Sequence, residues 1–321
     1  IKPHWPYIVP APYHDMYGPN SFLPVVRHPD ELVDPHPVYA AFSGNVIGTA
    51  FKQDAVREAA LGAYMGLIKQ IDDQMGVLFA HLRESGQIDN TVIVITSDHG
   101  DYLGDHWLGE KDLFHDPSVR VPMIIYDPSP EADATRGTVS DALVESIDLL
   151  PTFVDMAGGT PRYEWLEGRS LMPLIRGETP SDWRKYTISE YDFSITPMAG
   201  RLDLAPKNAR LFMVADDRWK FMHAEGGFPP MLFDLQNDPH ELNDLGRDPT
   251  YGAAVADCYD RLFEWARRSS QRTTISDQQI DERRGKTRRK GIVLGIADDT
   301  AADENAEILS LYRGKARQRF V

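Results

Sequence analysis

The sequence has little cysteine, no long apolar runs and few positive charges. Cys258 is the only cysteine among 321 residues, which excludes an intrachain disulfide and predicts a reducing compartment, the cytoplasm. No stretch reaches the roughly 18 apolar residues of a membrane span, so none is predicted. With 34 Lys and Arg against 49 Asp and Glu, the net charge of -15 argues against nucleic-acid and anionic-membrane partners. An anionic ligand would therefore need a local positive site, such as a metal ion.

The first 50 residues are instead rich in proline, histidine and tyrosine, as in KPHWPYIVPAPYHDMYGP. Each proline fixes φ and disfavours helix at the residue before it, so this part is predicted to be extended and loop-like. A long ordered loop often borders a functional site. A plain surface connector is an equally good interpretation of most of this segment.

The middle of the chain alternates between helical and strand patterns. From Gln53 to Glu84 apolar residues recur at spacings of three and four, which predicts an amphipathic helix that ends near Gly86. TVIVIT, residues 91–96, is a continuous β-branched run, typical of a central strand in a parallel sheet. A second run, VPMIIYD (121–127), and a helical pattern at 146–158 follow. This order predicts a doubly wound α/β domain.

Composition changes after about residue 185. Four short segments separated by turn residues predict a small antiparallel sheet, and Tyr251 to Arg268 has a helical pattern. From about Gln271 the chain is more polar, which predicts an extension that packs on a partner subunit or stays mobile. The sequence thus divides into three predicted parts: 1–184, an α/β portion; 185–270, a small antiparallel sheet with a helix; and 271–321, an extension suited to oligomer contacts.

Two residues that could bind a metal ion follow the 91–96 strand. In open α/β sheets ligands bind at the carboxyl ends of strands, where Asp98 and His99 lie, and Gly100 would permit the backbone to bend there. A carboxylate oxygen and an imidazole nitrogen suit Mn²⁺, Zn²⁺ or Fe²⁺, whereas an all-oxygen set would favour Ca²⁺ or Mg²⁺. The alternative is structural, with Asp98 as a cap and His99 in a polar niche.

Two further residues could contact an anionic ester. Lys111 lies on the loop leaving the same strand and could bind a phosphoryl or sulfuryl oxygen, although a solvated surface lysine is the simpler interpretation. His4 lies between prolines in KPHWPY and could protonate a departing oxygen near neutral pH. The other histidines are interpreted as structural or surface residues. His106 and His115, which flank Lys111, are the first that would need reconsideration.

Seven stretches follow one another along the chain in this order: KPHWPY, GQIDNT, TSDHGDYLGDH, GEKDLFHDPSVRVPMII, ESIDLLPTFVDMAG, LEGRSLMPLIRG and LFDLQNDPHELNDL. With these stretches the chain resembles the sulfatase family of the alkaline-phosphatase superfamily. The resemblance implies an α/β fold, an alkaline-phosphatase-like mixed sheet sandwiched by helices, with a smaller C-terminal antiparallel-sheet subdomain. Residues 1–184 would then be the C-terminal portion of the catalytic domain.

Within that family, the PAPYHDMYG loop and the DHWLGEKDLFHDPS stretch are most similar to phosphonate monoester hydrolases, which are also phosphodiesterases. The resemblance implies that Asp98 and His99 bind the catalytic metal. It also implies that His4 and Lys111 contact the transferred group and its leaving oxygen. The histidine at position 99 favours Mn²⁺, with Fe²⁺, Zn²⁺ and Ca²⁺ as alternatives.

The resemblance also shows what this sequence does not contain. Family members carry their nucleophile in a C-x-P-x-R motif, whose cysteine becomes formylglycine, and two further acidic metal ligands near the N-terminus. Cys258 lies in DCYDRL, without the required proline or arginine, and no S-x-P-x-R substitute occurs. The chain therefore resembles the C-terminal part of such an enzyme. The formylglycine, the first strands of the sheet and half of the metal shell are expected upstream of Ile1.

The predicted function is metal-dependent hydrolysis of phosphonate monoesters and phosphodiesters, with a small anionic ester as substrate. The resemblance implies a homo-oligomer, with a tetramer as one form. A sulfatase acting on aryl or alkyl sulfate esters is the alternative, and a catalytically inactive scaffold is a further one. A relative of phosphopentomutases or nucleotide pyrophosphatases would use Ser or Thr and usually two metals. The KPH and LFDLQNDPHEL stretches argue against it.

Overall fold

The computed structural model describes residues 2–268 and 277–283. Residues 2–268 belong to one compact unit, and residues 277–283 belong to a separate one. The predicted oligomer contacts of the tail fall mostly on residues 284–321 and lie outside the described residues. No helix in the described ranges is both long and apolar enough to cross a membrane.

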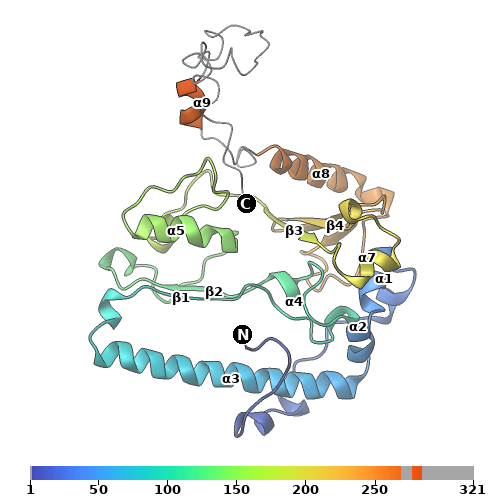
Figure 1. Cartoon of the computed structure of the whole chain (residues 1–321), viewed down its shortest axis with the longest axis horizontal. Helices are drawn as coiled ribbons and strands as arrows, with labels where there is room; N and C mark the ends of the chain where they lie inside the picture. The colour runs from blue at the N-terminus through green and yellow to red at the C-terminus, as the bar shows by residue number, and fades with distance from the viewer. Residues whose placement is uncertain (1, 269–276, 284–321) are drawn as a thin grey trace, which may run out of the picture. The chain divides into compact units, whose positions relative to one another are not determined.

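The described helices and strands are shown in Figure 1. The helices are α1 (Pro37–Ser43), α2 (Val46–Phe51), α3 (Asp54–Glu84), α4 (Asp116–Val119), α5 (Leu149–Met156), α6 (Met172–Ile175), α7 (Pro197–Arg201), α8 (Gly252–Ala266) and α9 (Asp277–Arg283). The strands are β1 (Ile93–Thr96), β2 (Met123–Tyr126), β3 (Thr187–Asp192), β4 (Arg210–Ala215), β5 (Trp219–Ala224) and β6 (Met231–Asp234).

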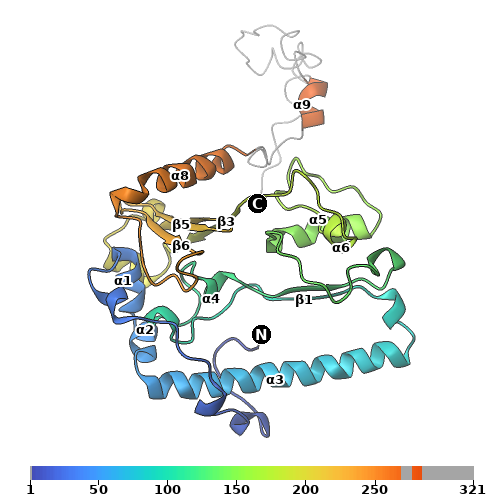
Figure 2. The same ribbon diagram turned by 180° about the vertical axis from the view of Figure 1, so that it is seen from behind.

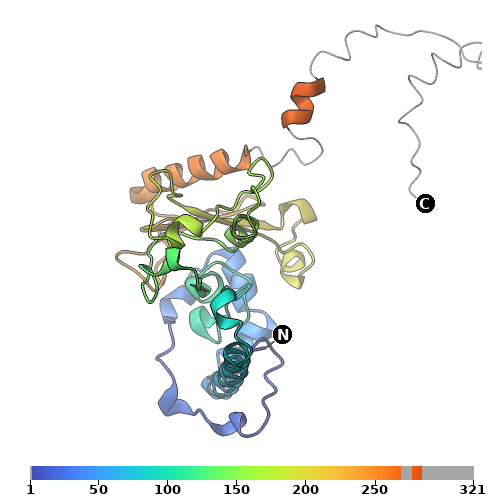
Figure 3. The ribbon, with the colours of Figure 1, turned by 90° about the vertical axis from the view of Figure 1, so that its left-hand side faces the viewer.

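The long helix α3 confirms the prediction made from its apolar spacing. It ends at Glu84 with Ser85 as its C-cap, and Gly86 follows with φ 69°, a left-handed conformation that glycine adopts without strain. The proline-rich N-terminal segment lies beside α3, which is viewed along its axis in Figure 3. Gly66 permits this approach, since a Cβ there would lie 2.4 Å from the Tyr13 carbonyl oxygen. The loop-like prediction for residues 1–50 therefore holds only for the segment before α1, which is ordered against the helix. It was wrong for the helices α1 and α2, because Pro37 occupies the first turn of α1, where its missing N–H is not needed.

The strands β1 and β2 correct the predicted parallel pairing of residues 91–96. They pair antiparallel, with Ile93 opposite Tyr126 and Thr96 opposite Met123. In the described part of the chain β1 is only partly buried. A β-branched run indicates burial but carries no information on strand direction, which the path of the connecting chain decides. The helices α3 and α5 lie on opposite sides of this pair (Figures 1 and 2).

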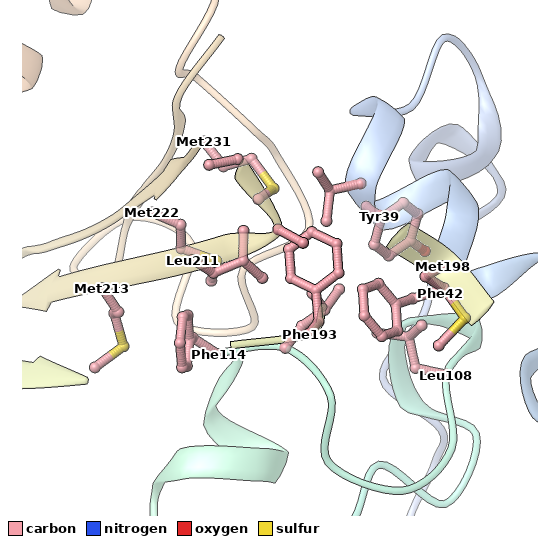
Figure 4. Close-up of a cluster of buried hydrophobic side chains, with 14 of the residues drawn as sticks. Tyr39, Phe42, Leu108, Phe114, Phe193, Met198, Leu211, Met213, Met222 and Met231 are labelled. Atoms are coloured by element: carbon pink, nitrogen blue, oxygen red, sulfur yellow. The ribbon is translucent and has the colours of Figure 1, made fainter. Parts of the chain in front are cut away.

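The strands β3 to β6 confirm the predicted small antiparallel sheet, in sequential order. One face packs on a core that includes side chains from α1, α7 and the loop before α4 (Figure 4). Residues on both sides of the predicted boundary at 184/185 therefore share this core, and that division stays a prediction. The core cluster comprises Val38, Tyr39, Phe42, Tyr102, Leu108, Leu113, Phe114, Phe193, Met198, Ala199, Ala209, Leu211, Met213, Ala215, Met222, Ala224, Met231 and Phe233.

The other face of the sheet packs on α8. Cys258 of α8 is buried with Val214, Phe221 and Leu232. Burial raises the pKa of the Cys258 thiol to about 12, so the thiol stays protonated at neutral pH. A protonated, buried thiol is a poor nucleophile. This agrees with the interpretation of Cys258 as an ordinary helical residue.

A buried ion pair connects the start of α5 with the chain leading into β3. Both Asp148 oxygens accept hydrogen bonds from the Arg184 guanidinium. The same carboxylate accepts bonds from the backbone N–H groups of Glu145, at 2.8 Å, and Arg169, at 2.7 Å. Because Asp148 is fully buried, each of these bonds replaces hydration that the carboxylate loses.

Candidate active site

The chain turns sharply at the end of β1. Gly100 N–H donates to the Ser118 carbonyl oxygen at 2.7 Å, which closes the loop from β1 to α4 at its base. A Cβ at Gly100 would lie 1.9 Å from the Pro117 carbonyl oxygen. Glycine is therefore required at this position by a close approach of two backbone segments. The predicted reason, backbone freedom at the bend, is secondary because Gly100 lies outside the positive-φ region.

Asp98 and His99 present two electron-pair donors side by side. The His99 Nδ1 lies 2.7 Å from the Gly100 carbonyl oxygen, so Nδ1–H donates and Nε2 keeps its lone pair. This Nε2 lies 3.7 Å from Asp98 Oδ2. The Asp98 side chain is 88% exposed, whereas that of His99 is 29% exposed. Two such donors at this separation suit one shared cation.

His4 and Lys111 meet beside this pair, although they are far apart in sequence. The Lys111 ammonium donates to His4 Nε2. The His4 Nδ1 lies 2.9 Å from the Trp5 carbonyl oxygen, which makes Nδ1 the donor and Nε2 the acceptor in the neutral ring. The rings of His4 and His99 lie edge to face, with centroids 5.5 Å apart. The structure thus brings all four predicted site residues into one place, while their catalytic and metal-binding roles stay predictions.

Lys111 is surrounded by carboxyl groups and fixed through its backbone. Burial raises the pKa of Glu110 and of Asp112, and the Lys111 charge opposes this in both. The Ser118 hydroxyl donates to the Lys111 carbonyl oxygen at 2.7 Å. The Tyr191 hydroxyl donates to Asp112 Oδ1 at 3.0 Å. The ammonium is therefore held on an anchored loop.

The donor set fits part of a metal site. Asp98 and His99 supply one oxygen and one nitrogen, a mixed set that suits Mn²⁺, Fe²⁺ or Zn²⁺. Among residues 2–268 and 277–283, no group of three or more His, Cys, Asp or Glu side chains forms a metal shell. The two donors would therefore need additional ligands.

Two family models together match most of the chain. The model described as Sulfatase matches residues 1–159, and the model described as N-sulphoglucosamine sulphohydrolase, C-terminal, matches residues 104–268. The chain belongs to the sulfatase family. This confirms the resemblance drawn from the sequence motifs.

Two curated proteins are similar to most of this chain. The multifunctional alkaline phosphatase superfamily protein PehA of Trinickia caryophylli is 35% identical over 288 residues, covering 85% of this chain and 55% of that protein. An arylsulfatase of Clostridium perfringens is 31% identical over 252 residues, covering 78% of this chain and 49% of that protein. This sulfatase-family chain spans about half the length of the curated relatives it matches.

A solved structure confirms the predicted fold class. The phosphonate monoester hydrolase SpPMH from Silicibacter pomeroyi superposes with a TM-score of 0.75 at 31% identity. The match covers 87% of this chain and 56% of that one. The sulfatase-family α/β fold with its small antiparallel sheet is therefore established for this chain.

A buried histidine pair supports the loop that carries Lys111. His106 stacks on His115, with ring centroids 4.2 Å apart and planes at 19°. His106 Nδ1 lies 2.7 Å from Glu31 Oε1, and both side chains are buried. The Tyr102 hydroxyl lies 2.9 Å from His115 Nδ1. These contacts agree with the structural role that the sequence predicted for both histidines.

This buried pair makes the stability of the fold sensitive to acid. Burial, together with the charges of His106 and Lys220, holds the pKa of His115 well below its usual value. The unfolded chain therefore takes up the proton first as the pH falls below about 6.5. The stability contributed by neutral His115 is present above that pH and is lost as the pH falls toward the folded-state pKa.

Replacing His115 with asparagine is expected to reduce this acid sensitivity. The free energy of unfolding of the wild type should fall more steeply between pH 6.5 and 5 than that of the variant, by up to about 1.4 kcal/mol per pH unit. Urea unfolding at a series of pH values measures the two slopes. His14→Asn, at an exposed histidine, should keep the wild-type slope. If the free energy of unfolding of His115→Asn fell as steeply with pH as that of the wild type, His115 would not be the source of the acid sensitivity.

A wide groove of about 1150 Å³ lies elsewhere and includes none of the four predicted site residues. Several charged side chains lining it are neutralised by one another. Arg184 pairs with Glu145 at 3.3 Å, and Arg268 pairs with Glu167. A groove in which two of the arginines are already paired with carboxylates is less suited to an anionic ester than the surroundings of Lys111. The size of the groove therefore does not make it the active site.

Sequence reasoning missed one polar contact that reaches the candidate site. The Tyr7 hydroxyl donates to Asp101 Oδ2 at 2.8 Å, joining the segment of His4 to the residue after Gly100. Both residues lie within the motifs KPHWPY and TSDHGDYLGDH. Their closeness to predicted site residues was the available signal, but the sequence could not show that the two side chains meet.

Proposed function

We propose that this chain contributes to metal-dependent hydrolysis of phosphonate monoesters and phosphodiesters. The observation that carries the proposal is the contact of Lys111 with His4 directly beside His99 and Asp98. This arrangement combines a cation and a proton donor with two metal-type donors at one strand end. Hydrolysis of an anionic ester is accelerated by each of these: charge neutralisation, protonation of a poor leaving oxygen and a Lewis acid.

Asp98 and His99 are the residues that would hold the metal ion. When bound, a divalent ion would polarise the non-bridging oxygens of the ester. Their nitrogen and oxygen donors support Mn²⁺ first, with Fe²⁺, Zn²⁺ and Ca²⁺ as alternatives. The Nδ1–H bond to Gly100 keeps the His99 tautomer that leaves Nε2 free for a metal.

Lys111 and His4 would act directly on the substrate. The Lys111 ammonium would neutralise negative charge on the transferred group as it builds up. In its imidazolium form, protonated at both ring nitrogens, His4 would give the proton on Nε2, the nitrogen that faces Lys111, to the departing alcohol oxygen and return to the neutral ring. Its Nδ1–H bond to the Trp5 carbonyl oxygen fixes the ring orientation for this transfer.

The nucleophile in this proposal is the formylglycine of the family motif. The 321 residues contain no C-x-P-x-R sequence, and the Cys258 thiol is buried. We further propose that the protein is a homo-oligomer, that its substrates are small anionic esters and that it acts in the cytoplasm. The similarity to SpPMH, named a phosphonate monoester hydrolase, supports phosphonate monoesters as the first substrate class.

Sulfate ester hydrolysis is the second candidate. The match to the N-sulphoglucosamine sulphohydrolase C-terminal model and the arylsulfatase relative favour it. Transferred phosphoryl and sulfuryl groups both present anionic oxygens to Lys111, so the same residues serve either reaction. Assays of an aryl phosphonate monoester, an aryl sulfate and a phosphodiester on the full-length protein distinguish the two. A preference for the sulfate would overturn the first candidate.

Replacing Asp98 with alanine is expected to weaken metal binding by at least about 10-fold, and turnover should fall with it. The reason is the loss of one of two donors that already lie together at the strand end. Metal content after dialysis and calorimetric titration with Mn²⁺ measure the effect independently of activity. Asp89→Ala, at an exposed aspartate ahead of β1, is the matched control. Unchanged metal content and turnover in Asp98→Ala would remove Asp98 from the site.

A further inference from the structure

One carboxylate connects the three segments that carry the predicted site residues. Asp101 Oδ2 accepts the hydrogen bond from the Tyr7 hydroxyl at 2.8 Å. Its Oδ1 accepts from the backbone N–H groups of Leu103 and Glu110, both at 3.1 Å. Asp101 follows the Asp98–Gly100 strand end directly. It therefore contacts the segment of His4 and both sides of the loop that leads to Lys111.

Two further backbone hydrogen bonds close the loop that Asp101 contacts. Tyr102 N–H donates to the Glu110 carbonyl oxygen at 2.8 Å, and Gly104 N–H donates to the Leu108 carbonyl oxygen at 2.8 Å. Lys111 comes directly after this closed loop. The position of its backbone therefore depends on the Asp101 contacts, whereas the position of His4 relative to it depends on Tyr7.

Tyr7 itself is well placed to act as an anchor. Its ring lies edge to face with that of Tyr64 on α3, with centroids 6.2 Å apart. Burial raises the pKa of the Tyr7 hydroxyl, and the Asp101 charge raises it further, so the hydroxyl remains a donor. The segment of His4 is exposed at Trp5 and Pro6, which leaves Tyr7 as a fixed point close to His4.

We propose that the Tyr7–Asp101 hydrogen bond is a positioning contact that holds His4 against Lys111 and the leaving oxygen. This inference rests on the proposed function, because His4 is taken as the group that protonates the departing alcohol. It assigns a role to Tyr7 without direct contact with substrate. Loss of the bond should therefore impair the step that depends on His4 more than substrate binding.

The test uses Tyr7→Phe in the full-length protein with aryl phosphonate monoesters whose phenols cover a range of acidity. Poor leaving groups need protonation by His4, whereas 4-nitrophenol departs with little help. We expect kcat to fall about 10-fold for the poorest leaving group, the size expected for one charge-assisted hydrogen bond. Little change is expected for 4-nitrophenol, and KM should stay near its wild-type value.

Tyr13→Phe is the matched control. Tyr13 lies on the same N-terminal segment as Tyr7, and its hydroxyl also donates to an aspartate, Asp73 Oδ2 of α3, at 3.0 Å. It should leave the dependence on the leaving group unchanged. The double variant His4→Ala with Tyr7→Phe should be no slower than His4→Ala, because Tyr7 acts through His4. Equal losses of kcat for every leaving group in Tyr7→Phe, or additive losses in the double variant, would overturn the inference.

A second measurement separates this inference from the proposed function. The ring resonances of His4 in NMR spectra, assigned by their loss in His4→Ala, should shift in Tyr7→Phe and stay in place in Tyr13→Phe. Unshifted His4 resonances in Tyr7→Phe would overturn the positioning contact whatever the enzyme hydrolyses. A wild-type protein that hydrolyses none of the three ester classes would overturn the proposed function, while the resonances still report on the contact.

Discussion

Replacing Lys111 with alanine is expected to lower kcat by about 10²- to 10³-fold, the effect of removing one preorganised group that stabilises transition-state charge. The ammonium sits on an anchored loop, with its carbonyl oxygen bonded to Ser118 and its Nζ against His4. Its charge is available to the ester without reorganisation of the chain. The variant also removes the donor to His4 Nε2. Steady-state kinetics with an aryl phosphonate monoester measure the loss.

Two controls sharpen the Lys111 prediction. Lys207→Ala removes an exposed lysine and should retain wild-type kcat. Lys111→Arg keeps the charge, but the planar guanidinium cannot reproduce the compact ammonium beside His4, so only partial recovery is expected. Thermal unfolding of each variant checks that the fold survives. A folded Lys111→Ala protein with wild-type kcat would refute the role of Lys111.

Replacing Asp148 with alanine is expected to destabilise the fold by about 3–5 kcal/mol, the range for breaking a buried ion pair. The variant removes both Asp148 oxygens that accept from the Arg184 guanidinium, which keeps only the Glu145 carboxylate at 3.3 Å. It also leaves the backbone N–H groups of Glu145 and Arg169 without theirs. Because Asp148 is fully buried, water cannot replace these bonds without opening the structure. Chemical denaturation followed by tryptophan fluorescence measures the change.

A double-mutant cycle isolates the ion pair from the other contacts of Asp148. Arg184→Met removes the cation and keeps most of the side-chain volume, and the double variant should be destabilised by less than the sum of the single variants. Asp141→Ala, at an exposed aspartate of the same segment, should change stability by less than about 0.5 kcal/mol. Additive single effects would show that Asp148 and Arg184 contribute independently.

The predicted elements differ in how well local pattern determined them. The helix from 54 to 84 and the small sheet formed as predicted, because a 3.6-residue period or short strands with turns specify them locally. The direction of β1 was wrong, since a continuous apolar run is compatible with either pairing. Gly100 was identified for its flexibility, yet its close approach to Pro117 is what requires glycine. Pro117 lies on the segment that the loop after β1 brings back to Gly100, so the sequence around Gly100 could not show this contact.

The sequence by itself determined the residue types of the candidate site and their order along the chain. It placed Asp98 and His99 after a strand, Lys111 on the following loop and His4 in a proline-rich segment. Only the tertiary structure decided that His4 meets Lys111, that Asp101 joins their segments through Tyr7, and that His106 stacks on His115. The physical reason is that local patterns report periodicity and backbone preference. Contacts between residues distant in sequence depend on how packed elements return the chain to one point.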